Sequence, residues 1–88
     1  MAKVLFKEDL FRENSVGITV ALEETQKQFH VKIYSNVWSS KRGPIVVRIK
    51  KEDGFQKAYS MYEKIIKSLQ TVVEKGESIR LALLSFVN

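Results

Sequence analysis

The chain contains no cysteine and a single histidine, His30. Disulfide scaffolds, zinc sites built on thiolates and catalysis by a thiol all require cysteine. A lone histidine on a strand is usually a surface or base-stacking residue and not a metal ligand or general base. No phosphate-binding glycine loop, dinucleotide fingerprint or zinc-ligand spacing occurs. The sequence therefore predicts a protein that is not an enzyme and that holds no cofactor or metal.

Long hydrophobic runs are also missing. The longest, residues 81–87, is far shorter than the roughly 20 residues that a membrane-spanning helix needs. Charged residues interrupt the apolar stretch near Met1, so we expect no signal peptide and a cytoplasmic location. The 88 residues suffice for one domain, expected to span 1–88, and oligomerisation would be a natural way to complete so small a core.

Acidic residues are absent from the centre of the chain. The net charge is +5, yet no Asp or Glu occurs between Glu24 and Glu52, whereas the flanking segments are balanced or slightly acidic. A field of one sign attracts polyanions, although lysines also solubilise exposed strands and protect the edges of sheets. The basic residues of this segment are Lys27, Lys32, Lys41, Arg42, Arg48, Lys50 and Lys51.

Alternating apolar and polar residues predict strands over 16–22, 29–38 and 45–50. The connections between these segments are short, which favours an antiparallel meander. A further strand is expected over 3–7, followed by a connector over most of 8–15.

Apolar residues then recur at steps of three and four from Phe55 to Val73, which predicts one long helix. Asp53 is a candidate N-cap, and Gly76 is a candidate C-terminal glycine. We expect the apolar stripe to cover one face of the sheet. Residues 78–87 fit a final strand better, although their Leu and Ala content also permits a helix. The predicted fold class is α+β, a twisted four-stranded antiparallel sheet closed by one long helix, with an extra C-terminal strand.

A sheet covered by one helix leaves its other face open. The alternation places cations and aromatic rings together on that face. Lys and Arg neutralise phosphates, and flat rings stack on unpaired bases for roughly 1–3 kcal/mol each. We therefore predict binding of single-stranded DNA or RNA. The candidate residues are His30, Lys32, Tyr34, Trp38, Lys41, Arg42, Arg48 and Lys50.

Two other interpretations stay open. Tyr34 and Trp38 could be cross-strand packing partners, or could be buried against a second subunit. The chain could also be a small interaction or inhibitor module that binds an acidic protein, because an acidic protein and a nucleic acid are both polyanions. The absence of acids between Glu24 and Glu52 favours nucleic acid.

The residue types of 17–24, 29–35 and 45–49, followed by 52–55, carry a resemblance that covers about residues 3–70. The order of four strands and a helix with a basic sheet resembles the PUR domain (the purine-rich-element-binding family) and, more distantly, its Whirly relatives. The resemblance implies single-stranded DNA or RNA binding on the sheet and two interlocked repeats. Because the chain holds one such repeat, it implies a homodimer. The segment after Gly76 has no counterpart in a single PUR repeat.

Overall fold

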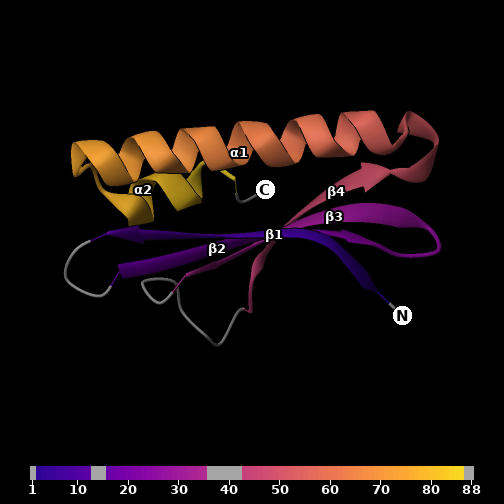
Figure 1. Ribbon diagram of the computed structural model, residues 1–88, viewed down its shortest axis with the longest axis horizontal. Coiled ribbons are helices and arrows are strands. Elements are labelled where there is room, and N and C mark those ends of the chain that lie inside the picture. The colour runs from indigo at the N-terminus through magenta and orange to yellow at the C-terminus, as the bar shows by residue number, and fades with distance from the viewer. Residues whose placement is uncertain (1, 13–15, 36–42, 87–88) are drawn as a thin grey trace.

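The computed structural model describes residues 2–12, 16–35 and 43–86. Four strands are followed by a single turn of 3₁₀ helix, a long helix and a short helix (Figure 1). Their bounds are β1 Lys3–Arg12, β2 Val16–Glu24, β3 Gln28–Ser35, β4 Ile45–Lys50, the 3₁₀ turn Lys51–Asp53, α1 Phe55–Lys75 and α2 Ile79–Leu84. The predicted α+β class, with an antiparallel four-stranded sheet closed by one long helix, is confirmed.

The strands form one antiparallel sheet in the order β1-β2-β3-β4. Cross-strand pairs such as Leu22 with Val31 and Val20 with Ile33 align the apolar residues of neighbouring strands. Residues opposite one another project from the same face of a sheet. The register therefore collects the apolar side chains on one face, as their alternation in the sequence predicts.

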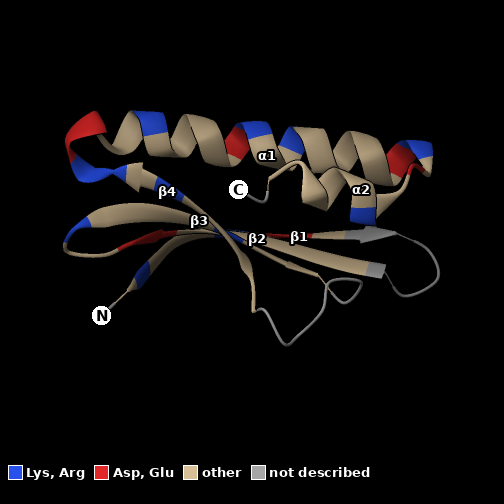
Figure 2. Ribbon diagram, turned by 180° about the vertical axis from the view of Figure 1, so that it is seen from behind, with Lys and Arg blue, Asp and Glu red and all other residues tan. Residues whose placement is uncertain are grey.

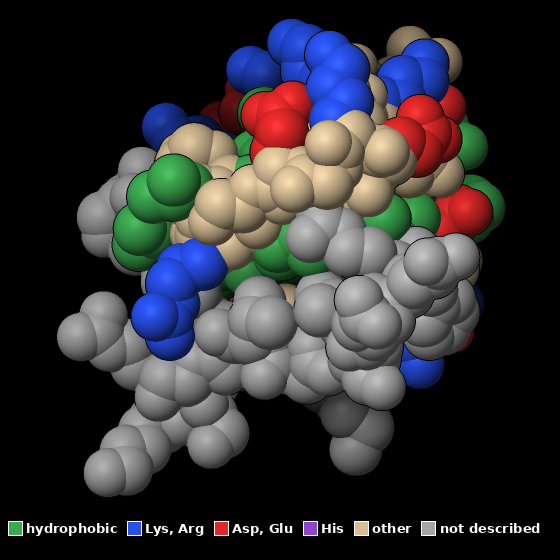
Figure 3. All heavy atoms as spheres, turned by 90° about the vertical axis from the view of Figure 1, so that its left-hand side faces the viewer, with side chains coloured by type: hydrophobic (Ala, Val, Ile, Leu, Met, Phe, Trp, Pro, Cys, Tyr) green, Lys and Arg blue, Asp and Glu red, His purple; other side chains and the backbone are tan. Residues whose placement is uncertain are grey.

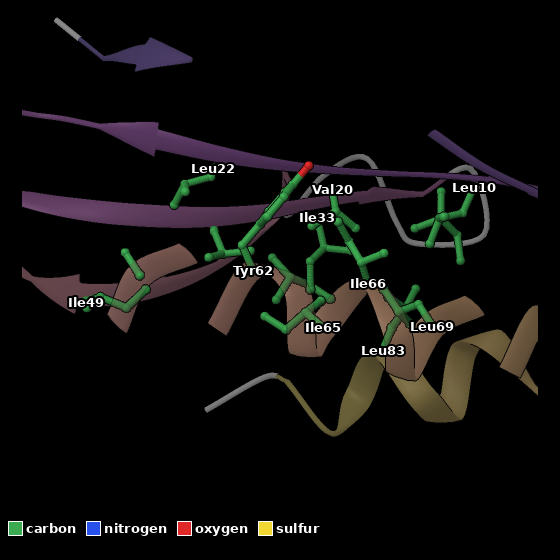
Figure 4. Close-up of a cluster of buried hydrophobic side chains, with 14 of the residues drawn as sticks. Leu10, Val20, Leu22, Ile33, Ile49, Tyr62, Ile65, Ile66, Leu69 and Leu83 are labelled. Atoms are coloured by element: carbon green, nitrogen blue, oxygen red, sulfur yellow. The ribbon is translucent and has the colours of Figure 1, made fainter. Parts of the chain in front are cut away.

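Helix α1 covers this apolar face, and the core lies between the two (Figure 4). Ile65 and Leu69 of α1 are at most 2% exposed, as are Val20 and Ile33 of the sheet. In Figure 4 these side chains point toward one another across the interface. The apolar stripe at three- and four-residue steps is thus the surface by which α1 packs on the sheet.

The two ends of α1 depend on glycine. Gly76 adopts the left-handed conformation, with φ 71°, and ends the helix as predicted. The prediction of Asp53 as N-cap is wrong, because Gly54 occupies that position with φ 89° and ψ 160°. Asp53 lies in the preceding 3₁₀ turn and contacts Lys57 at 3.8 Å. A residue with a Cβ rarely adopts the Gly54 conformation, so the change in chain direction is made at the glycine.

Strand β1 is longer than predicted. It continues to Arg12, through a segment expected to be mostly connector. Glu8 and Asp9 are compatible with this position because β1 is an edge strand, where charged side chains reach solvent. Thr19 of β2 donates a hydrogen bond of 2.7 Å to Asp9, and Leu10 is buried opposite Ile18.

The prediction of a C-terminal strand over 78–87 is wrong. Residues 79–84 form α2, and the Ser78 side chain accepts a hydrogen bond from the Leu81 N–H at 3.3 Å. Ile79 and Leu83, four residues apart, are buried, whereas Leu81 between them is 69% exposed. The alternation that predicted a strand is therefore incidental, and the buried residues follow the four-residue spacing of a helix. Helix α2 lies beneath the C-terminal half of α1, on the same side of the sheet (Figure 1).

Within the part of the chain that the structure describes, no helix is long and apolar enough to cross a membrane.

Candidate nucleic-acid interface

The sheet face opposite α1 carries neither described helix, since α1 and α2 both lie on the other side (Figures 1 and 2). We call it the open face. Cross-strand pairs define its rows, for example His30 with Arg48 and Thr19 with Tyr34. Its described residues are Val4, Lys7, Asp9, Thr19, Ala21, Glu23, Gln28, His30, Lys32, Tyr34, Val46, Arg48 and Lys50.

Five of the eight candidate residues lie on the open face, where the strand alternation placed them. They are His30, Lys32 and Tyr34 of β3 and Arg48 and Lys50 of β4. The other candidates, Trp38, Lys41 and Arg42, fall outside the described residues. The structure therefore brings together every candidate that it describes.

The absence of acids between Glu24 and Glu52 suggests a purely cationic open face. The structure shows that this face also carries acidic side chains. Lys32 Nζ lies 3.1 Å from Glu23 Oε1, and the two side chains are 25% and 8% exposed. Glu23 lies just outside the acid-free segment of the sequence, yet β2 places it diagonally across from Lys32. Asp9 is a second acid on this face. Lys32 is thus one member of an ion pair instead of a free cation.

Arg48 and Lys50 keep the character expected of them. Both side chains are exposed, and neither forms an ion pair with an acid among the described residues. Lys7 of β1 shares these properties and adds a cation at the opposite edge of the sheet. Sequence reasoning missed Lys7 because the register of β1 against β2 was needed to assign its face.

Lys51 belongs to the cationic segment but not to the open face. Its Nζ lies 2.9 Å from Glu24 Oε2, donates to the Thr25 carbonyl oxygen at 2.7 Å, and lies 5.1 Å from the centre of the Phe29 ring. Phe29 is buried on the side of α1. Lys51 thus links the 3₁₀ turn before α1 to the end of β2 and to Thr25. It does not lie on the open face with Arg48 and Lys50.

His30 is half-buried on the open face, with Nε2 2.8 Å from the Gln28 side-chain nitrogen. Burial lowers the pKa of His30 below its ordinary value of about 6.5. The positive charges of Lys32 and Arg48 lower it further, and Glu23 partly opposes them. At neutral pH the ring is therefore uncharged, and it contributes a flat surface instead of a positive charge.

A hollow of about 270 Å³ opens on this face between β1 and Tyr34. Tyr34, which is 41% exposed, lines one side of the hollow, and Ala21, which is 3% exposed, lies deeper. The remaining lining residues are Val4, Lys7, Thr19 and Glu23. The hollow combines an aromatic ring, a cation and a carboxylate.

The outer surface of α1 differs from the open face in its charge pattern. Basic and acidic residues are interspersed along the helix in Figure 2, and side chains of both signs lie next to one another at the end of the molecule seen in Figure 3. A hollow of about 280 Å³ on this surface is lined by α1 residues alone, including Tyr59, Glu63 and Lys64. The described residues contain no cluster of three or more His, Asp or Glu side chains that could hold a metal ion.

No protein-family model matches the chain, and neither a curated protein nor a solved structure matches it. The resemblance to the PUR and Whirly families stays a prediction.

Proposed function

We propose that the protein binds single-stranded DNA or RNA on the open face of its sheet. The observation that carries the proposal is the combination of exposed cations, which form no ion pair with a described acid, and an exposed ring on a sheet face that no described helix covers. Arg48 and Lys50 supply the cations from β4, and Tyr34 supplies the ring from β3. Duplex DNA would instead favour a helix or ribbon that enters a groove, and the outer surface of α1 carries charges of both signs (Figure 2).

Different residues of the open face would bind the phosphates and the bases of the strand. Arg48 and Lys50 would neutralise phosphates along β4, and Lys7 would do so along β1. Tyr34 and the uncharged ring of His30 would stack on bases between these two rows. The pairing of Lys32 with Glu23 removes one cation from this set, so among the described residues the attraction depends on Arg48, Lys50 and Lys7.

The proposal includes a homodimer and a cytoplasmic location, both expected from the sequence. An acidic protein is the alternative partner, because it would be attracted by the same cations. Nothing in the described residues favours the acidic protein over nucleic acid. Tyr34 favours nucleic acid, because an exposed ring offers a stacking surface that unpaired bases use.

A charge reversal on each side of the molecule tests the proposal. Arg48→Glu/Lys50→Glu changes the open face, and Lys64→Glu/Lys67→Glu makes the same change in net charge on the exposed side of α1. We expect the first variant to lose more than about tenfold in affinity for a labelled single-stranded oligonucleotide, measured by fluorescence anisotropy, and the second to lose far less. Loss of two phosphate contacts should also reduce the slope of log affinity against log salt by about 1.4.

Equal losses in the two variants would contradict a site on the open face, because they would show dependence on net charge alone. A wild-type protein that binds no oligonucleotide at low salt would contradict nucleic-acid binding itself. Circular dichroism of both variants provides the folding control, since all four substituted side chains are exposed.

A further inference from the structure

The hollow beside Tyr34 has the volume and the lining residues of a binding site for one small flat group. Its volume of about 270 Å³ lies just below the roughly 300–1,000 Å³ typical of pockets for drug-sized ligands. It exists because Ala21, a small residue, lies between larger side chains of β1 and β3. A single base of a bound strand matches this size better than a larger ligand does.

Tyr34 gives the hollow an aromatic side. The ring is exposed on the same face as Lys7, which also lines the hollow and forms no ion pair with a described acid. A base stacked on Tyr34 would therefore bring its phosphate within the field of a cation. Stacking alone is tolerant of sequence, because every base has a flat face.

Glu23 adds a hydrogen-bond acceptor, which can distinguish between bases where stacking cannot. Glu23 is one of the residues that line the hollow, its side chain is 8% exposed, and its Oε1 contacts Lys32. An ionised carboxylate only accepts hydrogen bonds, and its two oxygens offer about four acceptor positions, more than one lysine contact uses. A carboxylate repels a phosphate, because both are negatively charged, but it accepts a hydrogen bond from the amino group of a base.

We propose that the hollow seats one base against Tyr34 and that Glu23 favours bases with an exocyclic amino group. Adenine, cytosine and guanine carry such a group. Thymine and uracil have no amino group, and their single N3–H donor lies between two carbonyl oxygens, which a carboxylate repels. This inference rests on the proposed function and adds a base preference to it.

Oligo-dC and oligo-dU provide a matched pair of probes, since the two pyrimidines are alike in size and differ in the amino group. We expect the wild-type protein to bind oligo-dC about tenfold more tightly than oligo-dU in anisotropy titrations at one salt concentration. In Glu23→Gln the preference should shrink to about twofold or less, because an amide both donates and accepts.

Equal affinity of the wild-type protein for both probes would overturn the base preference and leave the proposed function standing. Binding to neither probe would overturn both. Tyr34→Ala tests the seat independently of Glu23, whose substitution leaves Lys32 without its partner and could impair folding. We expect this exposed substitution to weaken binding of both probes by roughly 5- to 150-fold. An unchanged affinity would exclude a base seated on Tyr34.

Discussion

His30 shows how one residue links the stability of the sheet to the chemistry of its open face. The ring lies between two cations and one acid, and its Nδ1 atom is buried with no hydrogen-bond partner among the described residues. Protonation would add a third positive charge next to Lys32 and Arg48. The folded chain therefore disfavours protonation of the ring, which lowers its pKa.

We expect this arrangement to make the protein less stable in mild acid. The pKa of His30 is lowered by folding, while the unfolded chain has the ordinary value of about 6.5. The unfolded state then takes up the proton first, so the contribution to stability is full above about pH 6.5 and is lost as the pH falls through the lowered pKa.

Urea unfolding at about pH 7.5 and about pH 5.5 measures this effect. The wild-type protein should lose more stability between the two conditions than His30→Gln, which has no histidine left to titrate. Carboxyl groups contribute equally to both proteins, so identical losses would show that His30 has no part in the pH dependence.

Among the elements, α2 departs most from the sequence pattern. A strand would place Leu81 and Leu83 on one face, whereas the helix buries Leu83 completely and leaves Leu81 69% exposed. Figure 4 shows Leu83 beside Leu69 of α1, so α2 contributes Leu83 to the core that α1 and the sheet share.

The two leucines give a direct test of this element. Leu83→Ala should lower the free energy of unfolding by about 2–5 kcal/mol, because it leaves a cavity in the core. Leu81→Ala should change it by about 0.5 kcal/mol or less, since the side chain is mostly in solvent. Chemical denaturation of both variants provides the measurement. Similar losses in the two would indicate a strand-like arrangement.

The whole molecule has two unlike sides. Helix α1 carries charges of both signs along its length (Figure 2), whereas the open face has an excess of cations around an exposed ring. Large apolar side chains are also partly exposed, including Phe6 and Phe55 at 43% each, with ring centres 6.2 Å apart. The small core and these exposed rings are consistent with an assembly of more than one chain.

The homodimer is tested by the mass of the protein in solution. Light scattering coupled to size-exclusion chromatography should report twice the 10.2 kDa of one chain over a range of concentrations, because a second copy would enlarge the small core of a single chain. A mass of one chain at every concentration would contradict the dimer without affecting the proposed site, which lies within one chain.

Local patterns in the sequence predicted much of this architecture. Alternation identified β2, β3 and β4 and the face of His30 and Arg48, since the face of a strand residue depends on a period of two. The helical period identified α1 and its buried stripe. The extent of β1 was missed because polar residues on an edge strand resemble a connector, and α2 was missed because its short segment fits both periods.

The sequence by itself determined the periods of the main elements, the side on which each residue of β3 and β4 lies, and the excess of positive charge. Only the tertiary structure decided that Glu23 pairs with Lys32, that Lys7 lies on the open face and that Lys51 pairs with Glu24. These outcomes depend on strand register and helix packing, which bring together residues distant in sequence, and no local period records such contacts.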